Sequence, residues 1–242
     1  MKTLLKHRLP LNWSTSFLSV ALTLTFALFG PQVHAEGTHL FILSGQSNME
    51  RLNPQISFTP AVEKSFGKAN VIVIKEAQGG KPIALWYQGS KAGDGKTGDF
   101  YKRIMTQVES ATQGKEIKSI TFVWMQGERD AQTGQAQIYS DNLAGLIEKL
   151  RADLKRKDMN VVIGRLSDFG MDKPDWVLLR ETQVKIAEAD PRGAWVNTDD
   201  LNDLPGKKGQ PVRNDLHLSK EGYVTLGQRF ADKAIELINR KP

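Results

Sequence analysis

The sequence contains no cysteine among its 242 residues. This absence excludes disulfide bonds, a cysteine nucleophile, thiolate zinc sites and iron–sulfur clusters. Histidine is scarce, and the chain holds four: His7, His34, His39 and His217. The chain also lacks internal repeats and tracts of biased composition. A content of 40% hydrophobic and 25% charged residues is typical of a globular protein, and excludes a disordered or collagen-like chain.

Acidic residues are absent from the first 35 positions, which have the pattern of a secretory signal peptide. Lys2, Lys6 and Arg8 precede an uncharged apolar run at Trp13–Phe29, and small residues follow in Val33-His34-Ala35. We expect cleavage after Ala35 and export to the periplasm or the outside of the cell. The alternative is an uncleaved membrane anchor, which the run of about 17 residues disfavours because a spanning helix needs roughly 20.

Removal of this segment changes the charge balance of the protein. The full chain carries 33 basic and 27 acidic side chains, a net charge of +6, and three of the basic ones lie in the first 35 residues. The mature chain therefore has a net charge of about +3, which does not indicate a nucleic-acid partner. We predict no nucleic-acid binding and no membrane association after cleavage. His39 and His217 are the histidines that remain.

Five apolar segments of the mature chain have the composition of buried parallel strands. They are rich in Val, Ile and Phe and lack strict alternation, as expected of strands that are covered on both faces. They are His39–Leu43, Val71–Ile74, Ile120–Met125, Val161–Leu166 and Ala194–Val196. Apolar positions with helical spacing separate or follow them, at 104–111, 138–154, 176–186 and 223–237, and Ser219 is the expected cap of the last helix. This order predicts a single α/β domain at 36–242, with helices on both faces of a parallel sheet.

Ligands of such sheets bind beyond the carboxyl ends of the strands, so the segments there are candidates for chemistry. Ser44-Gly45-Gln46-Ser47-Asn48-Met49 follows the first strand. A serine on a sharp strand-to-helix turn exposes its hydroxyl group and directs its own N–H toward a bound oxyanion. The alternative is that Ser47 only caps the following helix.

A serine nucleophile needs a base, and the scarcity of histidine narrows the choice. His39 lies at the amino end of the first predicted strand, eight residues before Ser47, which places it about 20 Å or more away at roughly 3.3 Å per residue. His217 remains, in the segment Asn214-Asp215-Leu216-His217 before the last helix. The alternative for His217 is a structural histidine near a helix start.

Two more segments lie at the carboxyl ends of predicted strands. Gly79 and Gly80 follow the second strand, and paired glycines can present a backbone N–H to a ligand. Gln126 and Glu128 follow the third strand and offer a side-chain amide and a carboxylate.

Together these segments resemble the SGNH-hydrolase superfamily, in its sialate O-acetylesterase-like branch, which includes the acetyl xylan esterases of carbohydrate esterase family 6. The resemblance rests on motifs that occur in the family order: Gly45-Gln46-Ser47-Asn48-Met49, Gly79-Gly80 with Trp86, Gln126-Gly127-Glu128-x-Asp130, and Asp215-x-His217. It implies a flavodoxin-like, three-layer α/β/α fold with a five-stranded parallel sheet. It also implies ester hydrolysis without a metal or another cofactor, on an acetylated carbohydrate.

Residue by residue, the resemblance makes Ser47 the nucleophile and His217 the general base. The oxyanion would be bound by the N–H of Ser47, the N–H of Gly80 in preference to Gly79, and the side chain of Gln126. We expect four further residues to line the substrate cleft: Gln46, Asn48, Gly79 and Trp86.

The acid that orients His217 is left open. The superfamily commonly has it three residues before the histidine, where this chain has Asn214. Asp215, two residues before His217, lies on the same face of an extended segment. Glu128 is the acid in some members of the branch. The third alternative is a dyad in which only a backbone carbonyl supports the histidine.

Two other functions share these residues. One is a secreted carbohydrate-binding module on a degenerate esterase scaffold, and the other is a lipid or aryl esterase of the same fold. The sequence specifies neither the sugar nor the oligomeric state.

Overall fold

The computed structural model describes residues 37–89, 95–203 and 213–240. The predicted signal peptide at 1–35 lies outside these ranges. Within them, no helix combines the length and the apolar character needed to cross a bilayer.

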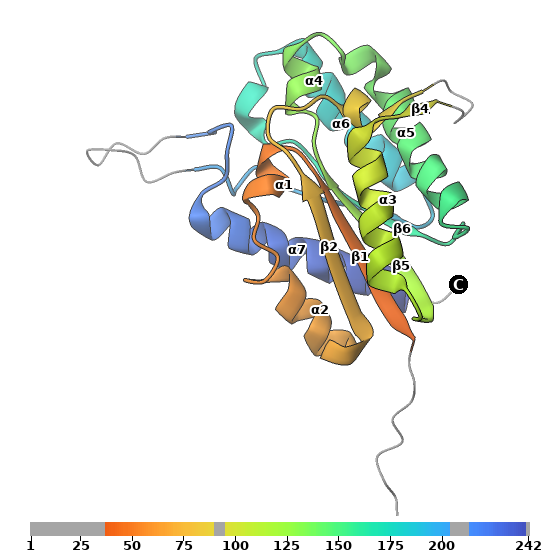
Figure 1. Cartoon of the computed structure of the whole chain (residues 1–242). Coiled ribbons are helices and arrows are strands. Elements are labelled where there is room, and N and C mark those ends of the chain that lie inside the picture. The colour runs from red at the N-terminus through yellow and green to blue at the C-terminus, as the bar shows by residue number, and fades with distance from the viewer. Residues whose placement is uncertain (1–36, 90–94, 204–212, 241–242) are drawn as a thin grey trace, which may run out of the picture. The chain divides into compact units, whose positions relative to one another are not determined.

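The core of the domain is a five-stranded sheet whose strands are all parallel, in the order β2-β1-β5-β6-β7 (Figure 1). This confirms the predicted sheet. The strands are β1 (Thr38–Gly45), β2 (Val71–Ala77), β5 (Ile117–Met125), β6 (Asn160–Gly164) and β7 (Gly193–Val196). A small antiparallel ribbon is formed by β3 (Tyr87–Gln88) and β4 (Lys96–Thr97).

Helices cover both faces of the sheet and complete the three layers. The helices are α1 (Ser47–Arg51), α2 (Phe58–Phe66), α3 (Asp99–Thr112), α4 (Glu128–Gln132), α5 (Ala136–Asp153), α6 (Pro174–Ala189) and α7 (Lys220–Asn239). Leu40 and Ile42 of β1 pack into the core shared with α3, α5 and α6. Phe41 and Leu43 pack into the core shared with α1, α2 and α7. Both faces of β1 are therefore buried, which explains why its sequence does not alternate.

The strand order reverses beside β1, because the chain passes from β1 to β2 on one side and then builds β5, β6 and β7 on the other. A crevice at the carboxyl ends of the strands forms at such a switch point. Gly45 of β1 is paired with Met125 of β5. The residues that follow these two strands, Ser47 and Gln126, therefore emerge at the same edge of the sheet.

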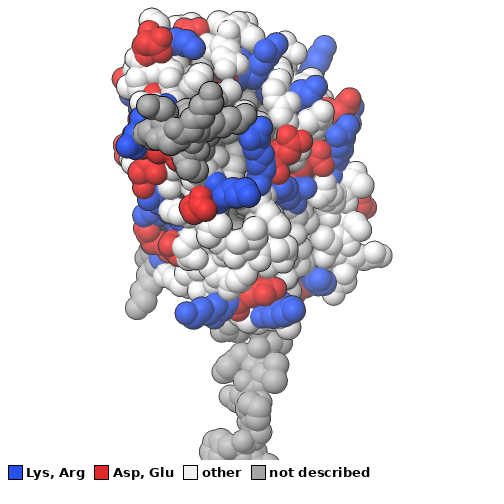
Figure 2. Space-filling model, turned by 90° about the vertical axis from the view of Figure 1, so that its left-hand side faces the viewer, with Lys and Arg blue, Asp and Glu red and all other residues white. Residues whose placement is uncertain are grey.

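The face formed by α2 and α7 has an area without charged side chains, bordered by charges of both signs (Figure 2). A groove of about 630 Å³ lies between the two helices, and its lining includes the exposed residues Ile56 and Val224. This groove lies along the outer surface of the helices and includes none of the predicted site residues.

Candidate active site

Ser47 is the first residue of α1, directly after β1. Gly45 has a φ of +151°, and a Cβ at this position would lie 1.9 Å from the carbonyl oxygen of Met125, so glycine is needed where the chain leaves the sheet. Helix α1 is anchored at its other end by Lys75, whose ammonium group donates to the carbonyls of Glu50 (2.9 Å) and Leu52 (2.8 Å). The burial that accompanies these contacts lowers the pKa of Lys75. Ser47 is thus held at a fixed point of the fold and remains partly exposed.

His217 lies opposite Ser47, although 170 positions separate the two residues in the sequence. The imidazole Nε2 is 3.2 Å from the hydroxyl oxygen of Ser47. His217 is half-buried on the loop before α7, and Ser219 caps that helix by accepting a hydrogen bond from the N–H of Gly222, as the sequence predicts. The structure therefore brings the predicted nucleophile and the predicted base into contact.

The environment of His217 favours a neutral imidazole. Burial and the nearby guanidinium of Arg51 lower the pKa of His217 below its ordinary value of 6.5, and the carboxylate of Asp215 opposes this shift. No ion pair joins Arg51 to a carboxylate in the described part of the chain. A neutral imidazole can accept the proton of a serine hydroxyl group.

Neither of the two predicted acids is hydrogen-bonded to the imidazole within residues 37–89, 95–203 and 213–240. The carboxylate of Asp215 accepts from the backbone N–H of His217 (2.8 Å), which closes a local turn. The carboxylate of Glu128 accepts from the side-chain amide of Asn48 (2.8 Å). The described geometry is therefore that of a Ser47–His217 dyad, in which Asp215 contacts the backbone of the loop and Glu128 contacts Asn48 of α1.

Glu128 is buried at the start of α4, with 2% of its surface exposed. One of its carboxylate oxygens, Oε2, has no hydrogen-bond partner among the described residues. Burial is the main cause that raises the pKa of Glu128 to about 7, and hydrogen bonds such as that from Asn48 counteract it.

The side-chain amide of Gln126 is engaged by protein acceptors in this structure, among them Gln46 Oε1 at 3.2 Å, and its role as an oxyanion donor stays a prediction. Its side chain is fully buried, and Nε2 lies 2.5 Å from a carboxylate oxygen of Asp130 and 3.1 Å from the carbonyl oxygen of Lys81. An amide nitrogen has two hydrogens, and these acceptors use both. Gln126 thus ties the end of β5 to α4 and to the turn after Gly80.

The two glycines after β2 differ in what their N–H groups contact. The N–H of Gly79 donates to the carboxylate of Glu50 (2.9 Å), and a Cβ on Gly79 would lie 3.4 Å from Cβ of Ser47. Gly80 is exposed, with a φ of +67°, and the described residues offer its N–H no acceptor. The N–H of Ser47, at the first position of α1, has no acceptor within the helix either. The N–H groups of Gly80 and Ser47 therefore have no acceptor among the described residues, and their role as oxyanion donors stays a prediction.

Three of the four residues predicted to line the cleft are buried and serve other purposes. Trp86 is fully buried, donates to the hydroxyl group of Ser44 (2.8 Å), and stacks on Phe100 with the ring centroids 4.6 Å apart. Gln46 is 3% exposed and accepts from the backbone N–H of Arg129 (3.2 Å). Asn48 is 1% exposed. Only Gly79, beside Ser47, is partly accessible.

The accessible cleft begins at Gly80 and contains residues that the sequence reasoning missed. It has a volume of about 490 Å³, and its lining includes Lys81, Leu85, Arg129 and Ile138. Leu85 is 37% exposed and Ile138 is 50% exposed. Ile138 follows the helical spacing of the buried residues in α5, so periodicity alone placed it in the core. Gly80, one of the predicted oxyanion donors, lines this cleft, whereas Ser47 and His217 do not.

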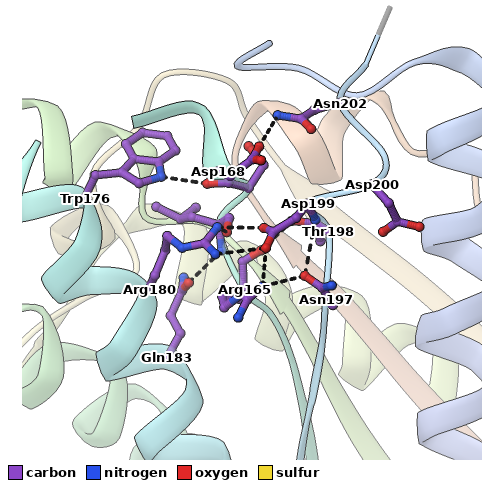
Figure 3. A network of polar contacts seen from close by, with 12 residues as sticks. Arg165, Asp168, Trp176, Arg180, Gln183, Asn197, Thr198, Asp199, Asp200 and Asn202 are labelled. Carbon is purple, nitrogen blue, oxygen red and sulfur yellow. Dashed lines mark hydrogen bonds and ion pairs between the residues drawn. The ribbon is translucent and has the colours of Figure 1, made fainter. Parts of the chain in front are cut away.

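A polar network at the ends of β6 and β7 supports the loop that carries His217 (Figure 3). Asp199 is held by Arg165 (2.5 Å) and Arg180 (2.8 Å). At the edge of this network, the side chain of Asn202 donates to Asp168 (3.0 Å) and to the carbonyl oxygen of Asp215 (2.9 Å). The backbone N–H of Asp215 donates back to the carbonyl oxygen of Asn202 (3.0 Å). The ends of two strands are thereby linked to the residue two positions before His217.

Residues 50–236 match the sequence profile of the family described as carbohydrate esterase, sialic acid-specific acetylesterase. The chain belongs to this family. The matched region of the chain contains Gly80, Gln126, Glu128 and His217, and begins three residues after Ser47.

Solved structures share the fold of this chain. The chain is 22% identical to a protein from Arabidopsis thaliana, with a TM-score of 0.62 over 82% of this chain and 98% of that one. It is 18% identical to a carbohydrate acetylesterase from Xanthomonas citri, with a TM-score of 0.63 over 82% of this chain and 56% of that one. It is 15% identical to Est24, a carbohydrate acetylesterase from Sinorhizobium meliloti, with a TM-score of 0.53 over 83% and 99% of the two chains. No curated protein sequence matches the chain. The flavodoxin-like fold of SGNH hydrolases is thus confirmed.

Proposed function

We propose that this protein is an exported serine hydrolase that removes O-acetyl groups from a carbohydrate, either sialic acid or a polysaccharide. The observation that carries the proposal is the 3.2 Å contact between Ser47 Oγ and His217 Nε2 at the switch point of the sheet. Gly80 supports it, because this exposed residue follows Gly79, which lies beside Ser47, and its N–H has no acceptor among the described residues.

In the proposed mechanism, Ser47 Oγ attacks the acetyl carbonyl carbon while His217 Nε2 takes the hydroxyl proton. The N–H groups of Ser47 and Gly80 bind the oxyanion, and each such donor contributes about 3 kcal/mol to lowering the barrier. The bond between the carbonyl carbon and the sugar oxygen then breaks, and His217 transfers its proton to that oxygen. Water, deprotonated by His217, attacks the acetyl-enzyme, and acetate leaves as the proton returns to Ser47.

Acetate release from defined esters tests this proposal. We expect the purified protein to release acetate from O-acetylated sialic acid or acetylated xylan, and to hydrolyse p-nitrophenyl acetate faster than p-nitrophenyl octanoate. A preference for octanoate would favour a lipid or aryl esterase. A protein that hydrolyses no ester and is not labelled at Ser47 by an organophosphonate would instead be a binding module.

The pH dependence of hydrolysis should report the ionisation of His217. Because the imidazole must be neutral to accept a proton, kcat/KM should fall at low pH, with the midpoint below 6.5, the ordinary pKa of histidine. Arg51 is one of the causes of this lowered pKa, so Arg51→Gln should move the midpoint upward. Arg240→Gln, at the far end of α7, is the matched control and should leave the midpoint in place. A wild-type midpoint above 6.5, or one that Arg51→Gln leaves unchanged, would contradict the proposed base.

The proposed export has its own test. When the full chain is expressed with a functional secretion pathway, we expect the mature protein to begin at Glu36, and N-terminal sequencing measures this directly. An intact Met1 on protein recovered from the membrane fraction would instead show an uncleaved anchor.

A further inference from the structure

Two consecutive residues of α1, Ser47 and Asn48, contact two consecutive residues of the loop before α7, Leu216 and His217. Ser47 and His217 are in contact, and so are their neighbours, because the side-chain amide of Asn48 donates to the carbonyl oxygen of Leu216 (3.1 Å). The residue after the predicted nucleophile therefore fixes the backbone just before the predicted base. Figure 1 shows α1, which contains Ser47 and Asn48, near the start of α7.

The orientation of the Asn48 amide is determined by two further partners. Its nitrogen also donates to Glu128 Oε1 (2.8 Å), and its oxygen accepts from the hydroxyl group of Tyr223 (2.9 Å). A rotated amide would place its oxygen against two acceptors, the carboxylate of Glu128 and the carbonyl of Leu216, at a site where buried polar groups need partners. Asn48 thus has one favourable orientation.

We propose that Asn48 is a positioning residue, which holds His217 at hydrogen-bonding distance from Ser47, and that Glu128 acts on His217 only through Asn48. This rests on the proposed function, in which His217 is the base. Asp215, the residue before Leu216, is hydrogen-bonded to Asn202. The loop is therefore fixed at two consecutive residues, and Asn48 is the anchor that comes from the same helix as the nucleophile.

Replacing the Asn48 side chain tests the proposal. Asn48→Ala should lower kcat for p-nitrophenyl acetate by about 10²-fold, the loss expected when a reacting group is displaced by roughly 1 Å, and should leave KM nearly unchanged. Asn160→Ala is the matched control, because Asn160 is also buried (2% exposed) but lies at the start of β6, at the opposite end of the strand from the site. It should reduce stability and leave kcat unchanged. A raised KM with unchanged kcat for Asn48→Ala would show substrate binding, and an equal loss of kcat in Asn160→Ala would show a general effect of destabilisation; either result overturns the proposal.

A milder variant covers the case in which Asn48→Ala does not fold. Tyr223→Phe keeps the ring and removes the hydroxyl group that orients the Asn48 amide. We expect a loss of kcat of roughly two- to tenfold, as for the loss of one hydrogen bond, without a change in KM. An unchanged kcat in this variant would overturn the proposal.

A double-mutant cycle tests whether Glu128 acts through Asn48. Glu128→Gln should keep most of kcat, because the glutamine oxygen still accepts from Asn48, whereas Glu128→Leu should lower kcat about as much as Asn48→Ala. Combining Glu128→Leu with Asn48→Ala should lower kcat no further than Asn48→Ala alone. Additive losses would show that Glu128 reaches His217 by another route, and would overturn the proposal.

The rate of organophosphonate labelling at Ser47 separates this proposal from the proposed function. If the wild type is labelled but releases no acetate from sugars, the substrate assignment fails, and labelling rates still measure positioning. If the wild type and Asn48→Ala are labelled equally fast, the positioning proposal fails while the serine chemistry stands. A wild type that is not labelled overturns both.

Discussion

Ser47→Ala is expected to reduce ester hydrolysis by about 10⁴-fold or more, because the acyl-enzyme cannot form without the hydroxyl group. The measurement is kcat for p-nitrophenyl acetate together with acetate release from acetylated sugars. Ser47 is partly exposed, and the substitution removes a single oxygen, so the fold should persist. Residual activity above the uncatalysed rate would come from the N–H groups of the oxyanion site.

Ser65→Ala is the matched control for Ser47→Ala. Ser65 is exposed on α2, away from the site, and its replacement should leave both kcat and organophosphonate labelling unchanged. In the wild type the label should be found on Ser47 and nowhere else. Undiminished turnover by Ser47→Ala would refute the proposed chemistry as a whole.

Glu128→Gln is expected to have the largest effect on stability, and the effect should depend on pH. In the folded protein the pKa of Glu128 is raised to about 7 from its ordinary value of 4.5, so folding favours the protonated carboxyl group. This preference contributes to the free energy of unfolding. The contribution is fully present below pH 4.5 and is lost as the pH rises through 7. At about 1.4 kcal/mol for each unit of pKa, the free energy of unfolding should fall by about 3 kcal/mol between these limits.

A glutamine at this position remains neutral, so Glu128→Gln should abolish this decline. We expect the variant to exceed the wild type by about 3 kcal/mol in free energy of unfolding at pH 8, and to differ little at pH 4.5. Urea denaturation at the two pH values measures both quantities. Glu109→Gln, on the exposed surface of α3, removes the same charge and should show no such difference. A variant that is less stable than the wild type at pH 8 would show that the ionised carboxylate stabilises the fold.

The sequence predicted the sheet and the Ser47–His217 pair for physical reasons that can be named. Parallel strands buried on both faces need continuous apolar runs, and these runs are visible in β1, β5 and β6 without any structure. The base followed from distance along an extended strand, which excluded His39 and left His217. The first argument depends on the composition of the strands, and the second on the length of an extended segment. Neither depends on the direction of a polar side chain.

The roles of the motif amides could not be obtained in the same way. Gln46, Asn48 and Gln126 follow strand ends, where a ligand site was expected, and an amide there has the same sequence signature whether it faces the cleft or the interior. In the structure all three are buried, and their hydrogen bonds join neighbouring loops. Trp86 was assigned to the cleft for its proximity to the glycine pair, although a large ring beside Phe100 gains more from burial. The missing information was the direction of each side chain, which depends on the whole fold.

The separation of 170 positions between Ser47 and His217 has a consequence for the growing polypeptide. Synthesis from the N-terminus delivers Ser47 early, with the α1 and β1 segments, and delivers His217 only just before α7. A nascent chain that ends before His217 therefore has the hydroxyl group but no base. The proposed activity therefore requires synthesis at least as far as His217.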